Sequence, residues 1–167
     1  MVEDIGIRPL AESLVERLGS AGKSVATAES CTGGWIAKAI TDIAGSSACF
    51  AYGLVSYSNG AKESLLGVKN ATIVDNGAVS DAVVGEMARG ALKLSGADYS
   101  VAVSGIAGPD GGSPEKPVGT VWFAWAVRNA NAIDVTSERM HFDGNRNEVR
   151  VQSVAHALRG VLDRAGA

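Results

Sequence analysis

Short strand-like runs alternate with helical patterns along the first hundred residues, and this alternation restricts the fold more than any other feature of the chain. Apolar residues at helical spacing indicate helices, whereas short β-like runs bounded by turn residues indicate strands. The predicted helices cover residues 7–18, about 35–43, 61–66, about 80–95 and a final stretch that begins after Asp143 or Asn145. The predicted strands cover residues 25–28, 54–57, 99–103, 120–127 and about 133–142. This order predicts an α/β fold, a three-layer domain with a central mixed β-sheet flanked by helices on both faces.

Length and composition indicate one globular domain. The chain has 167 residues, which fits a single domain over 1–167. Hydrophobic residues make up 46% and charged residues 20%, and these fractions exclude a disordered chain. The formal net charge is -3. A general nucleic-acid binder normally shows a basic stripe, so this balance argues against nucleic acid as a partner.

The sequence also predicts where the protein works. No apolar stretch approaches the roughly 18 residues of a membrane-spanning helix. The N-terminus, M-V-E-D-I-G, is acidic and lacks the apolar run of a secretory signal. Cys31 and Cys49 match no metal-ligand spacing. We therefore expect a cytoplasmic protein with free thiols, no membrane association and no metal.

Two glycine-rich segments imitate nucleotide-binding motifs. Residues 19–24, G-S-A-G-K-S, resemble the end of a phosphate-binding loop, but Arg17 stands where the motif needs glycine and the strand and helix come in the wrong order. Residues 105–112, G-I-A-G-P-D-G-G, resemble a dinucleotide fingerprint, but Pro109 prevents the helix that should start there. The first segment is predicted to be a turn. The second follows a buried strand and is predicted to form the glycine-rich wall of a different pocket.

Two further patterns are compatible with anion binding. Residues 29–34, E-S-C-T-G-G, lie at a strand-to-helix junction, where exposed amides beside the Ser30 and Thr32 hydroxyls suit an anion. A simple N-cap explains the same residues. Arg146 and Arg150 lie one turn apart at the start of the last helix, where the helix dipole disfavours cations. This position suggests a ligand anion, and a solvated helix face is the alternative.

A serine, a tyrosine and a lysine surround the strand predicted at 54–57. Ser46 or Ser47 begins a helical turn whose amides suit an oxyanion, and Lys62 begins a helix after a turn. The helix dipole and burial both lower the pKa of such a lysine, which makes it a candidate base for a serine. Tyr57 is placed to relay the proton. The alternative is an N-cap serine, an exposed lysine and a core tyrosine.

The two histidines, His141 and His156, lie in no triad-like context, so a Ser-His-Asp enzyme is not expected.

Six motifs together resemble the CinA C-terminal-domain family. They occur in the family's order between about residues 7 and 163, and they read T-A-E-S-C-T-G-G, I-T-D-I-A-G-S-S, V-S-Y-S-N-G-A-K, G-A-V-S, S-G-I-A-G-P-D-G-G-S-P-E-K-P-V-G-T-V and G-N-R. Active members are nicotinamide-nucleotide amidases. They convert nicotinamide mononucleotide (NMN) to nicotinic acid mononucleotide and ammonia in pyridine-nucleotide salvage.

The resemblance implies roles for individual residues. Ser47 is the implied nucleophile, Lys62 its base and Tyr57 their support, with Ser30 as the second candidate nucleophile. The implied substrate-binding residues are Ser30, Cys31, Thr32, Gly33, Ser104, Gly105 and Arg146, of which the arginine contacts the phosphate. The family often has Gly-Asp-Arg where this chain has G-N-R, and the arginine is retained. The resemblance implies no cofactor, and it implies a homo-oligomer.

Two other functions are compatible with the same residues. A non-catalytic nucleotide-binding module of the family would use this pocket without turnover. A DNA-associated competence protein is suggested by the family's historical name, and the acidic net charge argues against it.

Overall fold

A five-stranded mixed sheet forms the middle of the molecule. The computed structural model describes residues 6–166. The strands are β1 (Val25–Glu29), β2 (Phe50–Val55), β3 (Tyr99–Gly105), β4 (Thr120–Arg128) and β5 (Ile133–His141). Their spatial order is β2-β1-β3-β4-β5, in which β1 pairs in parallel with both β2 and β3, and the pairs β3–β4 and β4–β5 are antiparallel. The predicted mixed sheet is confirmed.

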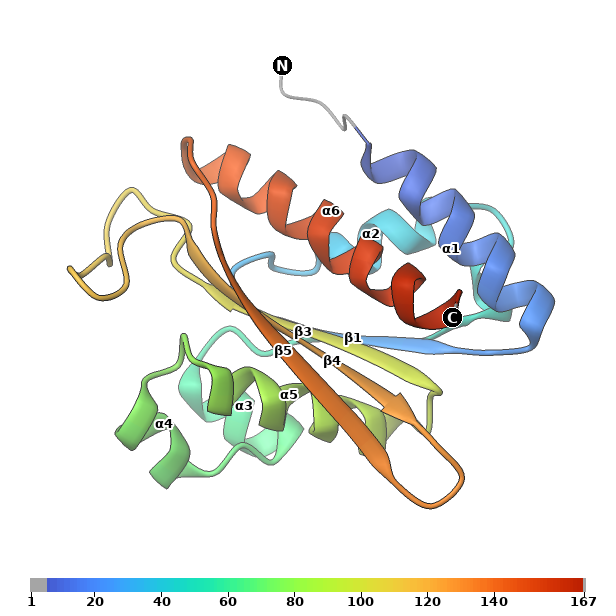
Figure 1. Ribbon diagram of the computed structural model, residues 1–167, viewed down its shortest axis with the longest axis horizontal. Helices are drawn as coiled ribbons and strands as arrows, with labels where there is room; N and C mark the ends of the chain where they lie inside the picture. The colour runs from blue at the N-terminus through green and yellow to red at the C-terminus, as the bar shows by residue number, and fades with distance from the viewer. Residues whose placement is uncertain (1–5, 167) are drawn as a thin grey trace.

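Helices cover both faces of the sheet. They are α1 (Ile7–Ala21), α2 (Trp35–Thr41), α3 (Asn59–Leu66), α4 (Asn70–Asn76), α5 (Asp81–Ser95) and α6 (Arg146–Ala165), with a 3₁₀ turn η1 (Ser46–Ala48) before β2. Figure 1 shows α1, α2 and α6 on one face and α3, α4 and α5 on the other. The three-layer prediction is therefore confirmed. None of the helices in the described part of the chain is long and apolar enough to cross a membrane.

The two sides of the sheet are packed differently. Large side chains such as Val103 and Phe123 point toward α1 and α6, whereas alanines such as Ala102 and Ala124 point toward α5. Because successive residues of a strand face opposite sides, this alternation in β3 and β4 separates the two cores. The small side chains let α5 pack close to the sheet. The core on the opposite face is larger, and the apolar side chains of the long amphipathic helices α1 and α6 pack into it.

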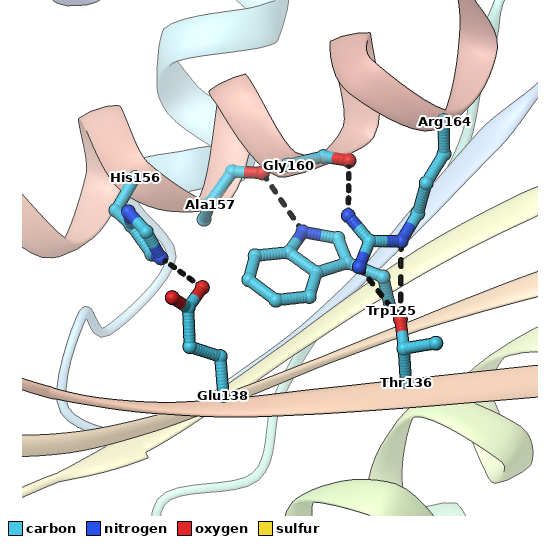
Figure 2. A network of polar contacts seen from close by, with 7 residues as sticks. All are labelled: Trp125, Thr136, Glu138, His156, Ala157, Gly160 and Arg164. Atoms are coloured by element: carbon cyan, nitrogen blue, oxygen red, sulfur yellow. Dashed lines mark hydrogen bonds and ion pairs between the residues drawn. The ribbon is translucent and has the colours of Figure 1, made fainter. Parts of the chain in front are cut away.

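Helix α6 is fastened to β4 and β5 by a network of polar contacts, shown in Figure 2. Trp125 in β4 donates from Nε1 to the Ala157 carbonyl at 3.1 Å, and the Arg164 guanidinium lies 4.3 Å from the centre of its ring. His156 pairs with Glu138 of β5 at 2.9 Å. These contacts give His156 a packing role, and they fix the position of α6 relative to the sheet.

A pair of glycines in α5 provides a test of this packing. A Cβ on Gly90 would lie 1.9 Å from the Leu66 carbonyl oxygen, whereas one on Gly85 would meet nothing closer than a Val135 methyl at 4.0 Å. We expect Gly90→Ala to lower the free energy of unfolding by about 1–3 kcal/mol, because α3 must move to make room for the methyl group. Gly85→Ala should raise it by about 0.4–1 kcal/mol. Urea unfolding of both variants tests this, and equal stability would contradict the described contact between α3 and α5.

Candidate active site

The parallel strands β1, β2 and β3 end together at one edge of the sheet. Glu29, the last residue of β1, is in register with Val55 of β2 and Val103 of β3. Ser30 follows β1 directly, and Ser104 lies at the end of β3. The carboxyl ends of parallel strands are the edge at which α/β proteins bind ligands. This edge is therefore where a site is expected.

Glu29 organises the turn that follows β1. Its side chain is fully buried, and its carboxylate accepts hydrogen bonds from the amides of Gly34, Ile36 and Ala37 at 3.0, 3.0 and 2.8 Å. A carboxylate at a helix N-terminus is favoured by the helix dipole. The anion at the start of α2 is thus the protein's own side chain. The predicted cap exists, but Glu29 supplies it, which leaves the Ser30 hydroxyl available for other contacts.

The Ser30 hydroxyl contacts the amine of Lys62. Lys62 Nζ lies 3.0 Å from Ser30 Oγ, 2.9 Å from the Ser56 carbonyl oxygen and 3.2 Å from the Tyr57 carbonyl oxygen. The lysine is in the first turn of α3, where the Ser58 hydroxyl caps the helix by accepting from Ala61. The turn between β2 and α3 thus directs the amine back toward the end of β1.

Lys62 is a buried amine without a carboxylate partner. Only 1% of its surface is exposed, and it takes part in no ion pair among residues 6–166. Burial disfavours the charged form and lowers the pKa of Lys62. The alternative of an exposed surface lysine is wrong. A neutral amine in hydrogen-bond contact with a serine hydroxyl is the arrangement that a general base requires.

The predicted pair of Ser47 and Lys62 is not formed within the chain. Ser47 lies in η1, before β2, whereas Lys62 follows the other end of that strand. Six residues of strand span about 20 Å, so the two side chains lie at opposite ends of the sheet. Ser47 is exposed. Strand β2 separates Ser47 from Lys62 along its whole length. The serine that contacts Lys62 is Ser30, which follows the neighbouring strand β1.

Tyr57 and Arg146 meet at the rim of this edge. Arg146 donates from Nη2 to the Tyr57 hydroxyl at 3.2 Å and from Nη1 to the Gly108 carbonyl oxygen at 2.8 Å. Tyr57 is 59% exposed, so the alternative of a core tyrosine is wrong. Its ring does not approach Lys62, which it contacts only through the main-chain carbonyl. Arg146 starts α6 immediately after a capping box made by Asn145 and Glu148.

The side chains of Cys31 and Thr32 point into the protein. Thr32 is fully buried and Cys31 is 7% exposed. Burial is the largest cause that raises the pKa of the Cys31 thiol to about 12, so the sulfur is a neutral thiol. A Cβ on Gly105 would lie 2.7 Å from Val121 Cγ2 and 3.1 Å from Cys31 Sγ, so glycine leaves room for both neighbours where β3 passes the turn. These three residues shape the turn.

The remaining predicted residues lie beside the turn. Ser104 is buried and donates to the Ala78 carbonyl oxygen at 2.9 Å, which ties the end of β3 to the loop before α5. Gly33 is exposed and has a φ of 60°, a conformation that glycine adopts without strain. Gly33 thus keeps the turn open to solvent, and Ser104 supports the wall next to Ser30.

Arg150 reaches the same turn from α6. It donates from Nε to the Cys31 carbonyl oxygen and from Nη2 to the Thr32 carbonyl oxygen, both at 3.1 Å. Its guanidinium lies 5.2 Å from the centre of the Trp35 ring. The alternative of a solvated helix face is therefore wrong for Arg150. Its position against the helix dipole is compensated by two carbonyl groups of the turn.

Comparison with known proteins identifies the family. The model of the CinA C-terminal domain matches residues 7–165, nearly the whole chain. The chain belongs to the CinA C-terminal domain family. The resemblance predicted from the six motifs is thereby confirmed.

Relatives of this CinA C-terminal domain include named enzymes. It is 56% identical over 155 residues to the nicotinamide-nucleotide amidohydrolase PncC of Escherichia coli K12, covering 93% of this chain and 92% of that protein. It is 54% identical over 156 residues to the protein of the same name from Pseudomonas putida, covering 93% and 95%. A solved structure of the competence/damage inducible protein CihA from Agrobacterium tumefaciens superposes with a TM-score of 0.93 at 44% identity, covering 100% and 99%.

A pocket of about 780 Å³ adjoins the turn of this CinA C-terminal domain. It is lined by Thr32, Gly33 and Trp35 together with side chains of α1 and α6 such as Arg8 and Arg150. Neither Ser30 nor Lys62 lines it, because the Ser30 hydroxyl faces α3 on the other side of the sheet. The pocket therefore borders the turn without containing the Ser30–Lys62 contact.

Sequence reasoning missed several groups at this site. The roles of Glu29 as a cap and of the Ser56 carbonyl as a partner of Lys62 were not predicted. An acidic residue at a strand-to-helix junction is a recognisable signal for the first, because helix N-termini favour carboxylates. The carbonyl contact has no sequence signal, since every residue carries the same group.

Proposed function

We propose that this chain hydrolyses the carboxamide of NMN to nicotinic acid mononucleotide and ammonia, in pyridine-nucleotide salvage. The observation that carries the proposal is the buried contact of 3.0 Å between Lys62 Nζ and Ser30 Oγ. The names of relatives more than 50% identical over nearly the whole chain support the substrate and the reaction. The proposed substrate is an intracellular nucleotide, so the cytoplasm is the proposed location, and cell fractionation tests it.

The contacts of Lys62 suit a neutral amine. An uncharged amine has two N–H donors and one lone pair. Lys62 Nζ donates to the Ser56 and Tyr57 carbonyl oxygens and to Ser30 Oγ. Once the amine is neutral, the same 3.0 Å contact lets the Ser30 hydroxyl donate to the nitrogen lone pair. Each group then has one partner of the right kind. This pairing supports Lys62 as the base and Ser30 as the nucleophile, in place of Ser47.

The proposed mechanism has two halves. Lys62 takes the Ser30 proton while Ser30 Oγ forms a bond to the carboxamide carbon, and main-chain amides stabilise the oxyanion. The tetrahedral intermediate collapses, the C–N bond breaks, and Lys62 returns its proton to the leaving ammonia. Water then gives a proton to Lys62 and attacks the acyl ester. The second intermediate then breaks its bond to Ser30 Oγ, which takes back the proton from Lys62, and the released carboxylic acid ionises to the carboxylate in water.

The rim residues are proposed to hold the nucleotide. Arg146 uses Nη1 and Nη2 in contacts with Gly108 and Tyr57, and it is exposed, so its remaining N–H groups can bind a phosphate. The Tyr57 hydroxyl beside it is free to donate to the same group, because it accepts from Arg146. Tyr57 is thus proposed as a substrate-binding residue and not as a proton relay.

A direct assay separates the enzyme from the alternative, a nucleotide-binding module without turnover. The purified chain is incubated with NMN, and ammonia and nicotinic acid mononucleotide are measured over time. We expect both products in equal amounts, continuing over many turnovers. Saturable binding of NMN with no ammonia would instead favour the module.

We further propose that the chain forms a homodimer through the edge strand β2. Its six residues, F-A-Y-G-L-V, include no charge and no proline, and Tyr52 and Val55 are exposed. The opposite edge strand, β5, carries Asp134, Glu138 and Arg139. Edge strands that must not pair are usually guarded by charges, bulges or proline. The unguarded edge supports pairing with β2 of a second copy.

The dimer is tested by size. Light scattering during gel filtration should give the mass of two chains. Tyr52→Lys adds a charge to the edge and should shift the protein to the mass of one chain, because two ammonium groups would meet in the paired strands. Asp134→Lys on β5 is the matched control and should not change the mass. A monomeric unmodified protein, or a dimer unaffected by Tyr52→Lys, would contradict the proposal.

A further inference from the structure

The pocket beside the turn has no part in the proposed reaction. Its volume is about 780 Å³, and residues of α1, α2 and α6 line it. Figure 1 shows these three helices together on one face of the sheet, whereas α3, which carries Lys62, lies on the other. Sites for small molecules usually have volumes of about 300–1,000 Å³. The pocket is thus large enough for a ligand of its own.

Arg150 lines this pocket with a guanidinium that is only partly used. Of its five N–H groups, one on Nε and one on Nη2 donate to the Cys31 and Thr32 carbonyl oxygens. The other three have no protein acceptor among residues 6–166. Nε and Nη2 form one edge of the flat group. The outer edge, with one N–H from each of Nη1 and Nη2, is a fork that matches two oxygens of a phosphate or carboxylate.

The charge of Arg150 is unmatched, and its position is fixed. Within residues 6–166 the guanidinium takes part in no ion pair. The two carbonyl groups and the Trp35 ring, whose centre lies 5.2 Å away, hold it in one orientation. A side chain that is already ordered loses little conformational freedom when a ligand binds. The outer edge of Arg150 is therefore a prepared site for an anion.

The charges around the pocket favour an anion with two negative charges. Arg8, Lys38 and Arg150 line it together with one carboxylate, that of Asp42, so its lining has two positive charges in excess. Glu12, the partner of Arg8, does not line the pocket. The pairs Arg8–Glu12 and Lys38–Asp42 are largely exposed, and exposed ion pairs are weak. A phosphate monoester carries about −1.5 to −2 charges at neutral pH, which fits this lining better than a single carboxylate does.

Another part of the lining is apolar. Trp35 and Ile43 border the pocket and are only half-buried, so some of their apolar surface faces solvent. Covering such surface is favourable, because apolar area is removed from water. A ligand that joins an apolar ring to its phosphate would cover this surface while the phosphate contacts Arg150.

We propose that the pocket between α1, α2 and α6 is a second binding site, for a phosphate monoester that carries an apolar ring, the class that includes mononucleotides. The phosphate lies on the outer edge of Arg150, and the ring lies against Trp35 and Ile43. The site is separate from the Ser30–Lys62 contact, and the proposal holds whether or not the chain hydrolyses NMN. Because Arg150 also bonds to the turn after Ser30, one side chain connects the two sites.

Phenyl phosphate is the probe, because it has the phosphate and the ring but no carboxamide to hydrolyse. Isothermal titration calorimetry of the whole chain should show saturable binding to one site per chain. Inorganic phosphate lacks the ring, and benzoate lacks the second charge. Both should bind at least about tenfold more weakly than phenyl phosphate.

Variants locate the bound probe. Lys38→Glu reverses a charge of the lining and leaves the bonds of Arg150 intact, so it should weaken binding at least about tenfold. Lys93→Glu, at an exposed position of α5 on the other face, makes the same change in net charge and should leave binding unchanged. Arg150→Gln should remove measurable binding, with urea unfolding as the check on its fold. Arg146→Gln, at the rim of the catalytic edge, should have no effect.

Four results would overturn the proposal. The first is no saturable binding of phenyl phosphate at millimolar concentration. The second is equal weakening by Lys38→Glu and Lys93→Glu, which would show a response to net charge alone. The third is weaker binding in Arg146→Gln with normal binding in Lys38→Glu, which would place the probe at the catalytic edge. The fourth is binding of inorganic phosphate or benzoate as tight as that of phenyl phosphate, which would contradict the class of ligand.

Discussion

Ser30→Ala is expected to reduce ammonia release from NMN by about 10⁴-fold or more, because no other hydroxyl contacts Lys62 in the described residues. Without the nucleophile, the lysine has no proton to take, and the amide must be attacked by unassisted water. The change removes one small buried oxygen, so the fold should persist. Steady-state measurement of ammonia, together with urea unfolding, checks both statements.

Ser47→Ala is the matched control for this experiment. Both serines belong to motifs that resemble the family. Ser47, however, is exposed in η1, at the end of β2 that is distant from Lys62. We expect Ser47→Ala to keep the activity of the unmodified protein. An inactive Ser47→Ala together with an active Ser30→Ala would reverse the assignment of the nucleophile. Loss of activity in both variants would indicate that both ends of β2 contribute to one site. A single chain cannot form such a site, because the two ends lie far apart, so a second chain would have to supply one of them.

Lys62→Met should also reduce activity by about 10⁴-fold, because the serine then lacks its base. For the unmodified protein, kcat/KM should rise with pH as the buried amine loses its proton. The inflection should lie below the ordinary lysine pKa of 10.5, since burial lowers the pKa of Lys62. A pH profile measured with NMN tests this. Activity that is independent of pH up to 10.5, or a Lys62→Met variant with normal turnover, would contradict the role.

The same residue predicts a change in stability with pH. The folded-state pKa of Lys62 lies below that of the unfolded chain, so between the two values the unfolded state binds more protons. The free energy of unfolding therefore rises as pH increases through this window. Lys62→Met removes this dependence, so the unmodified protein should gain stability relative to the variant as the pH is raised from neutral toward 10.5. Urea unfolding at several pH values measures it.

Lys93→Met, at an exposed position of α5, is the control for the stability experiment. Lys93→Met removes an exposed lysine and leaves the buried amine of Lys62 in place, so the rise in stability with pH should persist in this variant. If Lys62→Met and Lys93→Met behave alike, the buried amine is not the source of the effect.

The order of helices and strands could be predicted because it depends on local patterns. Short β-like runs bounded by turn residues identified β3, β4 and β5 close to their observed limits, and the helical spacing identified α1, α5 and α6. Helix α4 (Asn70–Asn76) was not predicted, because its seven residues bury only Ile73 and so have little periodicity. Strand β2 was predicted at 54–57 and is observed at Phe50–Val55, so the prediction started four residues late and ended two residues late. An edge strand with exposed Ala51 and Tyr52 lacks the pattern of a half-buried strand.

The pairing within the site could not be predicted in the same way. Ser47 and Lys62 are 15 positions apart, and Ser30 and Lys62 are 32 apart, so distance in the sequence favoured Ser47, which lies at the other end of β2 from Lys62. What brings Ser30 to Lys62 is the parallel register of β1 and β2, which aligns Glu29 with Val55. That register is a property of the assembled sheet. The proposed chemistry, in which a lysine is the base for a serine hydroxyl, could be predicted from the residue types.

The late position of α6 has a consequence for how activity arises during synthesis. Arg150 contacts Cys31 and Thr32 across more than a hundred residues of sequence, and Arg146 contacts Gly108 across 38. A chain that ends before Arg146 would contain Ser30 and Lys62 but neither arginine, so the turn after β1 would lack its contacts from α6. The proposed amidase activity would therefore require that the whole of α6 is synthesised and packed on β4 and β5.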